Sequence, residues 1–143
     1  MPVHVLGSNP PVVYVGLNVS EDAATRGRGR PLNEGVVALI DTGASRTAIA
    51  LEAARRLGAL QHGQDEVLRP DGEMETRPTF SIRVAFEPNF ADPLWPRKVR
   101  FFPVIAVEAR LATPGVEVLI GQDILSQVVL AHDGPARRLL LMY

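Results

Sequence analysis

Short apolar stretches separated by Pro and Gly run along the whole chain, and they predict a mainly β domain. Val, Ile and Phe, which favour strands, are common in these stretches. The segments VVALI and VEVLI are almost wholly apolar, which is typical of strands that are buried on both faces. The expected strands lie near residues 11–19, 36–40, 79–87, 98–108, 116–120, 127–132 and 137–142.

Two helices are expected between these strands. The first is TAIALEAARRLG (47–58), where Ser45 is the expected N-cap and Gly58 is placed to end the helix at C′. A second helix of one or two turns is expected around GQDIL (121–125), with Asp123 near its start. The apolar positions that share one face of the first helix are Ile49, Ala53, Ala54 and Leu57.

Length and composition indicate one ordinary globular domain over residues 1–143, with 1–10 expected to be a loose N-terminal segment. The net charge of −1 gives no reason to expect nucleic acid or an acidic membrane surface as a partner. The sequence shows no secretion signal and no apolar run of the roughly 20 residues that a membrane-spanning helix needs. We therefore expect a soluble, cytoplasmic protein.

Residue usage also narrows the possible chemistry. The chain has no cysteine, which excludes disulfides, thiol catalysis and cysteine-based zinc sites. Its three histidines, His4, His62 and His132, are widely spaced and form no metal-site pattern. We therefore expect neither a metal nor a cofactor.

A carboxylate stands directly after an apolar strand in LIDTGAS (39–45), where an ionisable group is costly unless it has a task. The strand would carry Asp41 to a turn at the floor of a cleft. Gly43 permits a sharp backbone conformation, and Thr42 and Ser45 supply hydroxyl groups for hydrogen bonds. The alternative is that Asp41 only caps the following helix, but it lies several residues too early for that role.

The segment LIDTGAS resembles the active-site loop of aspartic proteases in their single-domain, retropepsin-like form, which includes small bacterial members. Downstream, VEVLIGQDIL (116–125) resembles the hydrophobic-hydrophobic-Gly element that supports this loop in the same family. The resemblance covers about residues 10–143. It implies an all-β acid-protease fold: a closed, barrel-like domain with one or two short helices, assembled as a homodimer. The residues expected beneath the Asp41 loop are Leu119, Ile120 and Gly121.

The same resemblance implies an aspartic endopeptidase that acts on peptide or protein substrates. Its catalytic residue would be Asp41, and two such carboxylates share one proton and activate a water. The chain has one D-T-G motif, so the second carboxylate is expected from another copy across a twofold axis. Gln122 stands where retroviral members often have a basic residue that braces the dimer. The active-site loop would comprise Asp41 with Thr42, Gly43, Ala44 and Ser45.

A hairpin between residues 66 and 80 is the expected flap over the cleft, because Asp71-Gly72 is a strong turn signal. Its tip is charged, whereas retroviral flap tips are glycine-rich and apolar. It is therefore open whether this segment is a flap or an ordinary surface hairpin. The residues assigned to the flap are Arg69, Asp71, Gly72 and Glu73.

Two other functions remain open from the sequence. A peptide-binding or dimerisation module with the same fold would lack proteolytic activity, since fold alone does not define function. The Arg-Gly alternation in residues 24–35 would suit a phosphate backbone, but a solvated loop explains it as well, and no nucleic-acid partner is expected. Substitution of Asp41 separates the first alternative from a protease.

Overall fold

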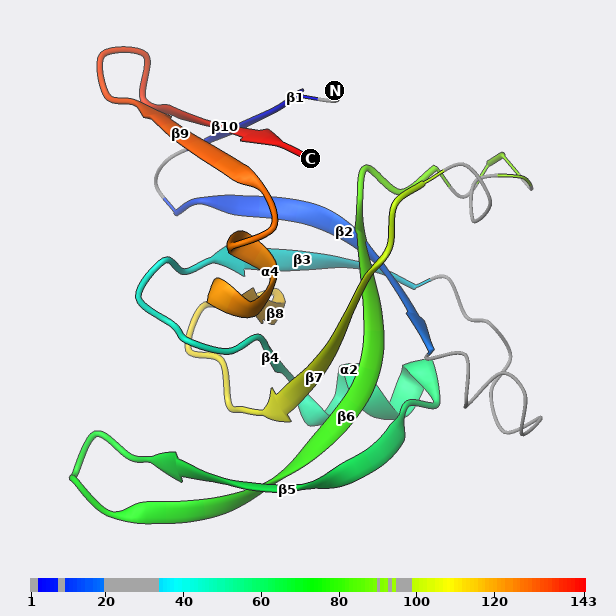
Figure 1. Cartoon of the computed structure of the whole chain (residues 1–143), viewed down its shortest axis with the longest axis vertical. Helices are drawn as coiled ribbons and strands as arrows, with labels where there is room; N and C mark the ends of the chain where they lie inside the picture. The colour runs from blue at the N-terminus through cyan, green and yellow to red at the C-terminus, as the bar shows by residue number, and fades with distance from the viewer. Residues whose placement is uncertain (1–2, 8–9, 20–33, 90, 93, 95–98) are drawn as a thin grey trace.

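The computed structural model describes residues 3–7, 10–19, 34–89, 91–92, 94 and 99–143. Within these residues, strands dominate and two short helices interrupt them (Figure 1). The elements in chain order are β1 (Val3–Gly7), β2 (Val12–Val19), β3 (Glu34–Ile40), β4 (Ala48–Ile49), α2 (Leu51–Leu57), β5 (Leu60–Leu68), β6 (Met74–Phe86), β7 (Phe102–Glu108), β8 (Val116–Ile120), α4 (Gln122–Leu125), β9 (Val129–Asp133) and β10 (Arg138–Met142).

The larger sheet closes into a barrel. Its strands follow the order β2-β3-β8-β4-β7-β6-β5, and a further pairing of β2 with β6 joins six of them into a ring. Most neighbours are antiparallel, but β3 runs parallel to β8 and β4 runs parallel to β7. Closure removes the exposed edges of these six strands and leaves β5 as the one that extends outside the ring.

Alternating side chains of the barrel strands fill its interior, as the period-2 pattern requires. Residues of β3 and β8 alternate between fully buried and half-buried positions. Helix α2 adds Ala53, Ala54 and Leu57 to the same core and ends at Gly58, whose φ is +67°. The predicted C-terminal glycine of this helix is therefore confirmed, since glycine tolerates this left-handed conformation.

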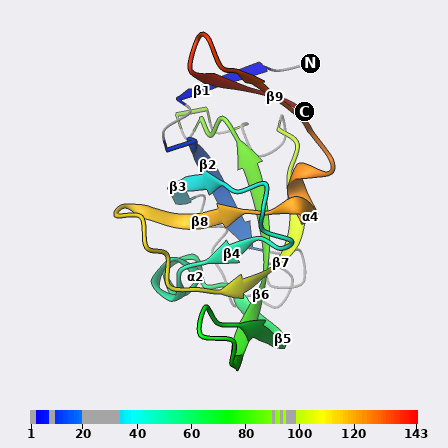
Figure 2. The same cartoon turned by 90° about the vertical axis from the view of Figure 1, so that its left-hand side faces the viewer.

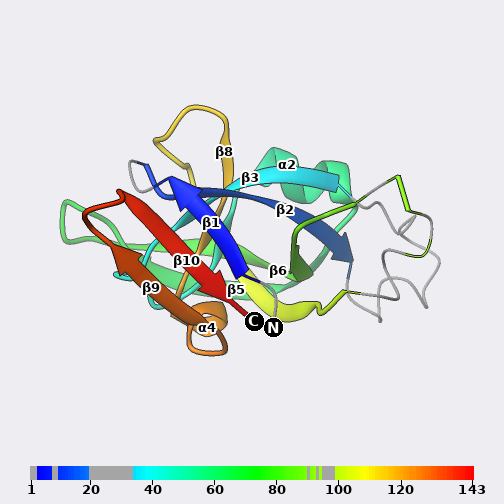
Figure 3. The same ribbon diagram turned by 90° about the horizontal axis from the view of Figure 1, so that it is seen from above.

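A three-stranded sheet of the order β1-β10-β9 lies over one end of the barrel, as seen from above in Figure 3. The expectation of a loose N-terminal segment was wrong for residues 3–7, because β1 pairs antiparallel with β10 along its whole length. Leu139 and Leu141 of β10 belong to the main core. Tyr143 packs its ring on Phe86, with ring centroids 5.1 Å apart, and so ties this sheet to the barrel.

The first predicted helix begins later than expected. Residues 48–49 form β4 between β7 and β8, and the helix starts at Leu51 with Ala50 as its N-cap, so Ser45 does not cap it. The hairpin of β5 and β6 extends beyond the predicted residues 66–80, because β5 begins at Leu60 and β6 ends at Phe86. Residues 24–33 of the Arg-Gly segment lie outside the described residues, while Glu34 and Gly35 begin β3.

Candidate active site

The segment that follows β3, residues 41–47, is named the Asp41 loop. Figure 2 shows it between β3 and β4, beside α4, with the β9–β10 hairpin above it and the β5–β6 hairpin below. The half-buried Asp41 is the first residue after β3, and its backbone N–H donates to the carbonyl of Ile120 at 3.0 Å. The barrel thus fixes the position of Asp41 through a hydrogen bond to the end of β8.

The Asp41 carboxylate is held by its own loop. The backbone N–H of Gly43 donates to Asp41 Oδ1 at 2.9 Å, and the N–H of Ala44 donates to the Asp41 carbonyl at 3.3 Å. A Cβ at residue 43 would lie 3.3 Å from the same Oδ1, which is a tight contact. The small residue therefore lets a backbone N–H approach the carboxylate and fix the position of one of its oxygens.

The structure brings the second predicted motif directly beneath the Asp41 loop. Leu39 and Ile40 of β3 are register partners of Leu119 and Ile120 in β8, and Gly121 follows. A Cβ at residue 121 would lie 2.4 Å from the carbonyl oxygen of Arg46, well inside any permissible contact. Glycine is required here because two backbone segments touch.

A polar network beneath the Asp41 loop was not predicted in this form. The fully buried Thr47 donates from its hydroxyl to Asp123 Oδ1 at 2.6 Å and from its backbone N–H to Asp123 Oδ2 at 2.9 Å. The Thr47 hydroxyl also accepts the N–H of Gly121 at 3.2 Å. Asp123 does lie at the start of α4, as expected, but its main task in the structure is to hold the end of the Asp41 loop.

Gln122 makes a second attachment that sequence reasoning missed. Its backbone N–H donates to the carbonyl of Ala44 at 2.9 Å, and its side-chain amide donates to the carbonyl of Thr42 at 2.7 Å. Both contacts join residues about eighty positions apart in sequence, so no local pattern signals them. Gln122 therefore binds the Asp41 loop of its own chain.

A cleft of about 460 Å³ separates the Asp41 loop from β5. Gly43, Ala44 and Ser45 line one side of it, and the stretch from Asp65 to Leu68 lines the other. Arg46 forms an ion pair with Asp65 across this cleft. The predicted loop residues Gly43, Ala44 and Ser45 thus face this cleft.

A second hollow, of about 420 Å³, lies on the other side of the Asp41 loop. The exposed Thr42 lines it together with Ile40, and β9 and β10 contribute His132 and Leu139. Thr42 thus presents its side chain away from the barrel interior, toward the face that carries the three-stranded sheet.

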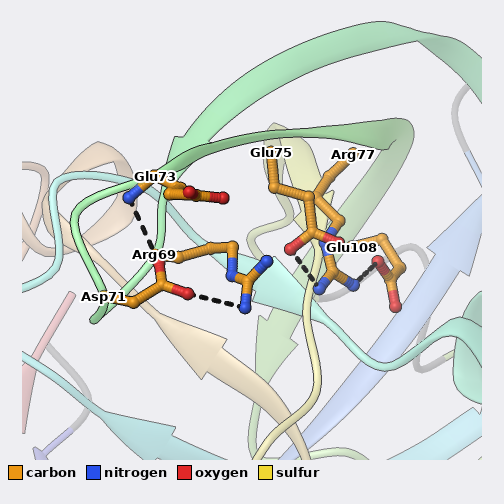
Figure 4. Close-up of polar contacts among 6 residues, drawn as sticks. All are labelled: Arg69, Asp71, Glu73, Glu75, Arg77 and Glu108. Carbon is orange, nitrogen blue, oxygen red and sulfur yellow. Dashed lines mark hydrogen bonds and ion pairs between the residues drawn. The ribbon is translucent and has the colours of Figure 1, made fainter.

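The β5–β6 hairpin has its turn at the predicted position. Gly72, with φ +86°, donates its N–H to the Arg69 carbonyl at 2.9 Å. Figure 4 shows the charged side chains of this tip, where Arg69 pairs with Asp71 at 2.7 Å and the N–H of Glu73 donates to Asp71 Oδ1 at 3.1 Å. These four residues are exposed, and their role as a flap stays a prediction.

Further down the hairpin, charged side chains connect it to the barrel (Figure 4). Arg77 of β6 donates to Glu108 at the end of β7 at 2.6 Å and to Glu75 at 2.8 Å. The hydrogen bond to Glu108, and then that to Glu75, raises the pKa of the Arg77 guanidinium above its ordinary value. Arg77 therefore stays charged throughout the range in which enzymes are assayed.

Within the described part of the chain, no group of three or more His, Asp or Glu side chains is arranged to hold a metal ion. Over the same residues, no helix reaches the length and apolarity needed to cross a bilayer.

Comparison with solved structures shows that the chain has the retropepsin-like fold. It is similar to a retropepsin-like aspartic protease from Rickettsia conorii, at 16% identity and a TM-score of 0.59, covering 99% of this chain and 91% of that chain. A second similar structure is the retroviral protease-like domain of Ddi1 from Leishmania major, at 16% identity, a TM-score of 0.44, and coverage of 90% and 86%. No protein-family model and no curated protein sequence matches the chain. The likeness to the Rickettsia structure confirms the predicted fold of the single chain. The homodimer and the roles of the individual site residues stay predictions.

Proposed function

We propose that the protein is an aspartic endopeptidase in which Asp41 of two copies forms the catalytic pair. The observation that carries this proposal is the position of the Asp41 carboxylate. It stands at the end of a barrel strand, accepts the Gly43 N–H, and belongs to a loop that borders a cleft. A carboxylate held at the end of a buried strand, in a loop that borders a cleft of about 460 Å³, suits acid–base chemistry on a bound peptide.

The chemistry requires a second carboxylate, and the other described aspartates are occupied elsewhere. Asp123 is bound to Thr47, and Asp65 is paired with Arg46. Asp71 pairs with Arg69 at the exposed hairpin tip, and the half-buried Asp133 pairs with Arg138 at the end of β9. Asp92 accepts the N–H of Leu94. Asp41 of a second copy is therefore the best candidate, and a twofold axis beside the exposed Thr42 would bring the two loops together.

In the proposed dimer the two Asp41 carboxyl groups share one proton, because two like charges about 3 Å apart cannot both ionise. The ionised carboxylate accepts a proton from a water, and the resulting oxygen attacks the peptide carbonyl. The protonated carboxyl donates to the carbonyl oxygen as the carbon becomes tetrahedral. Gly43 keeps one carboxylate oxygen fixed during these transfers.

The β5–β6 hairpin is the proposed lid of this site. It forms the second wall of the cleft, and an extended substrate between β5 and the Asp41 loop would bind through main-chain hydrogen bonds. Closure of the hairpin would exclude water other than the reacting one.

The test compares the wild type with Asp41→Asn on a diverse peptide mixture, at roughly pH 4 to pH 7, the range in which such a pair holds one proton. Asp133→Asn, at the end of β9, is the matched control. Mass spectrometry should find cleavage by the wild type and the control, with inhibition by a statine-type compound, and none by Asp41→Asn. Sedimentation should find the active species to be a dimer.

Three outcomes would contradict the proposal. Cleavage that survives Asp41→Asn would place the active site elsewhere, and an active monomer would exclude a pair formed between copies. If every folded variant leaves all peptides intact yet binds them, the peptide-binding module replaces the protease.

A further inference from the structure

The peptide group between Thr42 and Gly43 is held from both sides. Its carbonyl oxygen accepts a hydrogen bond from the Gln122 side-chain amide at 2.7 Å. Its N–H, which belongs to Gly43, donates to Asp41 Oδ1 at 2.9 Å. Because a trans peptide group is planar, its C=O and N–H point in opposite directions, so fixing one fixes the aim of the other.

We propose that Gln122 is a positioning residue, which acts on the Asp41 carboxylate through this peptide group. The proposal deepens the function given above and rests on it. Gln122 never touches the reacting atoms in this arrangement. It anchors the carbonyl of Thr42 and thereby directs the Gly43 N–H at the carboxylate.

The residue at the far end of this connection is suited to the task. Gln122 is the first residue of α4, and it follows Gly121, which is locked against Arg46. Its backbone N–H binds the Ala44 carbonyl at 2.9 Å, so its two donors hold the loop on both sides of Gly43. Glycine has the widest choice of backbone conformations, and an outside anchor is what restricts its peptide group.

The Gln122 side chain is exposed, so burial does not explain its position. Its amide donates to the Thr42 carbonyl and so polarises the peptide group between Thr42 and Gly43. Because hydrogen bonds in a chain strengthen one another, this makes the Gly43 N–H a stronger donor. A stronger N–H donor then holds the Asp41 carboxylate oxygen more firmly in the orientation that the proposed reaction needs.

Several charged groups surround this part of the site and also influence its pH dependence. Arg46, Asp65 and Glu66 line the cleft that Gly43 borders. His132 lines the hollow beside Thr42, and Asp123 of α4 is bound to Thr47. The substitution Gln122→Met leaves all of these charges in place. It removes the amide donor at nearly constant side-chain length, so a change in the pH profile reports the donor alone.

The experiment measures kcat and KM against pH for the wild type, Gln122→Met and Gln127→Met. The last is the matched control, because the Gln127 amide donates to the Asp123 carbonyl at 2.8 Å from the other end of α4 and is not bonded to the Asp41 loop. For Gln122→Met we expect kcat to fall about three- to tenfold, the effect of one hydrogen bond, with KM within about twofold. The acid limb of the kcat profile should move about half a unit to one unit toward higher pH.

A second measurement does not depend on activity. In ¹H–¹⁵N spectra, the Gly43 amide proton should move upfield in Gln122→Met, because its hydrogen bond to Asp41 weakens, and stay in place in Gln127→Met. A Gly43 signal and a pH profile that are both unchanged in Gln122→Met would overturn the positioning role. A wild type that cleaves no peptide would instead contradict the proposed protease, while the Gly43 signal would still decide whether Gln122 controls this peptide group.

Discussion

The two walls of the cleft are held by different kinds of interaction. The Asp41 loop is fixed by backbone contacts and by the buried Thr47–Asp123 network. The hairpin arm, defined as residues 64–68 and 74–78, pairs only within itself among the described strands. Ion pairs join it to the rest of the domain: Arg46–Asp65, whose side chains are each 39% exposed, and Arg77–Glu108, which is more buried. Buried hydrogen bonds are expensive to leave unmade, whereas exposed ion pairs contribute little.

This difference suits the two roles that the proposed protease gives to these walls. A loop that carries a reacting carboxylate must keep its geometry, and the structure places its least replaceable contacts there. A hairpin that admits a chain and then covers it must open at low cost, and local opening is easiest where few buried contacts hold an element. An isolated two-stranded hairpin is itself only marginally stable, which suits such a movement.

The largest expected effect comes from Gly121→Ala, compared with the same change at Gly72 in the hairpin tip. A Cβ at residue 121 would lie 2.4 Å from the Arg46 carbonyl oxygen, so we expect a loss of about 3 kcal/mol in the free energy of unfolding. At residue 72 nothing lies within 4 Å, and only the φ of +86° opposes the change, at about 1 kcal/mol. Urea unfolding at one protein concentration measures both, and equal losses would contradict the comparison.

Thr47→Val tests the network beneath the loop and should cost about 2 kcal/mol. The change keeps the shape of a fully buried side chain but removes the hydroxyl that Asp123 and the Gly121 N–H both use. Thr76→Val, on an exposed face of the hairpin, is the control and should change stability by less than about 0.5 kcal/mol. Urea unfolding compares the two variants. A Thr47→Val protein as stable as the control would show that the network does not hold the loop.

The elements that could be predicted from the sequence are those with a local pattern of apolar residues, and those fixed by long-range contacts could not. Strands 36–40 and 116–120 were predicted correctly because they are continuous apolar runs, and the structure has them as Glu34–Ile40 and Val116–Ile120. The helix start was wrong because Thr47 and its neighbours carry helical spacing, yet tertiary contacts draw them into β4 and the Asp123 network. The local helical preference of these residues is outweighed by the stabilisation that they gain from long-range strand pairing.

Other parts of the site had no local signal. Strand β5 was not predicted over its full length, because LQHGQDEVL is mostly polar and lies half in solvent. The glycines of both motifs were identified from the sequence. The reason why residue 121 must be glycine, its close approach to Arg46, could not be predicted, because the two residues lie 75 positions apart. The Gln122–Thr42 hydrogen bond spans a similar distance. Such contacts follow from the closed barrel and cannot be read from spacing within either motif.

An intermediate effect is expected where the hairpin meets the barrel, at the pair of Arg77 with Glu108. Arg77→Met leaves the nearly buried Glu108 carboxylate without its guanidinium partner and should cost about 1 kcal/mol. Because the pKa of Arg77 is raised in the folded protein, the charged guanidinium contributes its full stabilisation of the fold at ordinary pH. This contribution is lost only as the pH rises through the raised pKa. A double-mutant cycle with Glu108→Gln, measured by urea unfolding from pH 6 to pH 9, should give a constant coupling energy. A coupling energy that changes over this range would contradict the assignment.

The smallest expected effect is at the hairpin tip, where Asp71 has two tasks that can be separated. Its Oδ2 pairs with Arg69, and its Oδ1 accepts the N–H of Glu73. Asp71→Asn keeps the acceptor and removes the charge, so it should change stability by less than about 0.5 kcal/mol, because an exposed ion pair is screened. Asp71→Ala also removes the acceptor and should cost more, up to about 1 kcal/mol, with faster hydrogen exchange at the Glu73 amide.

The order of these two variants decides what holds the tip of the proposed lid. If Asp71→Ala alone speeds exchange, turn hydrogen bonding shapes the tip and its charges are free to meet solvent or substrate. If Asp71→Asn has the same effect, and added salt reproduces it in the wild type, the ion pair itself holds the turn. The second result would weaken the contrast between the two walls, because an ion pair would then fix the hairpin turn as backbone contacts fix the Asp41 loop.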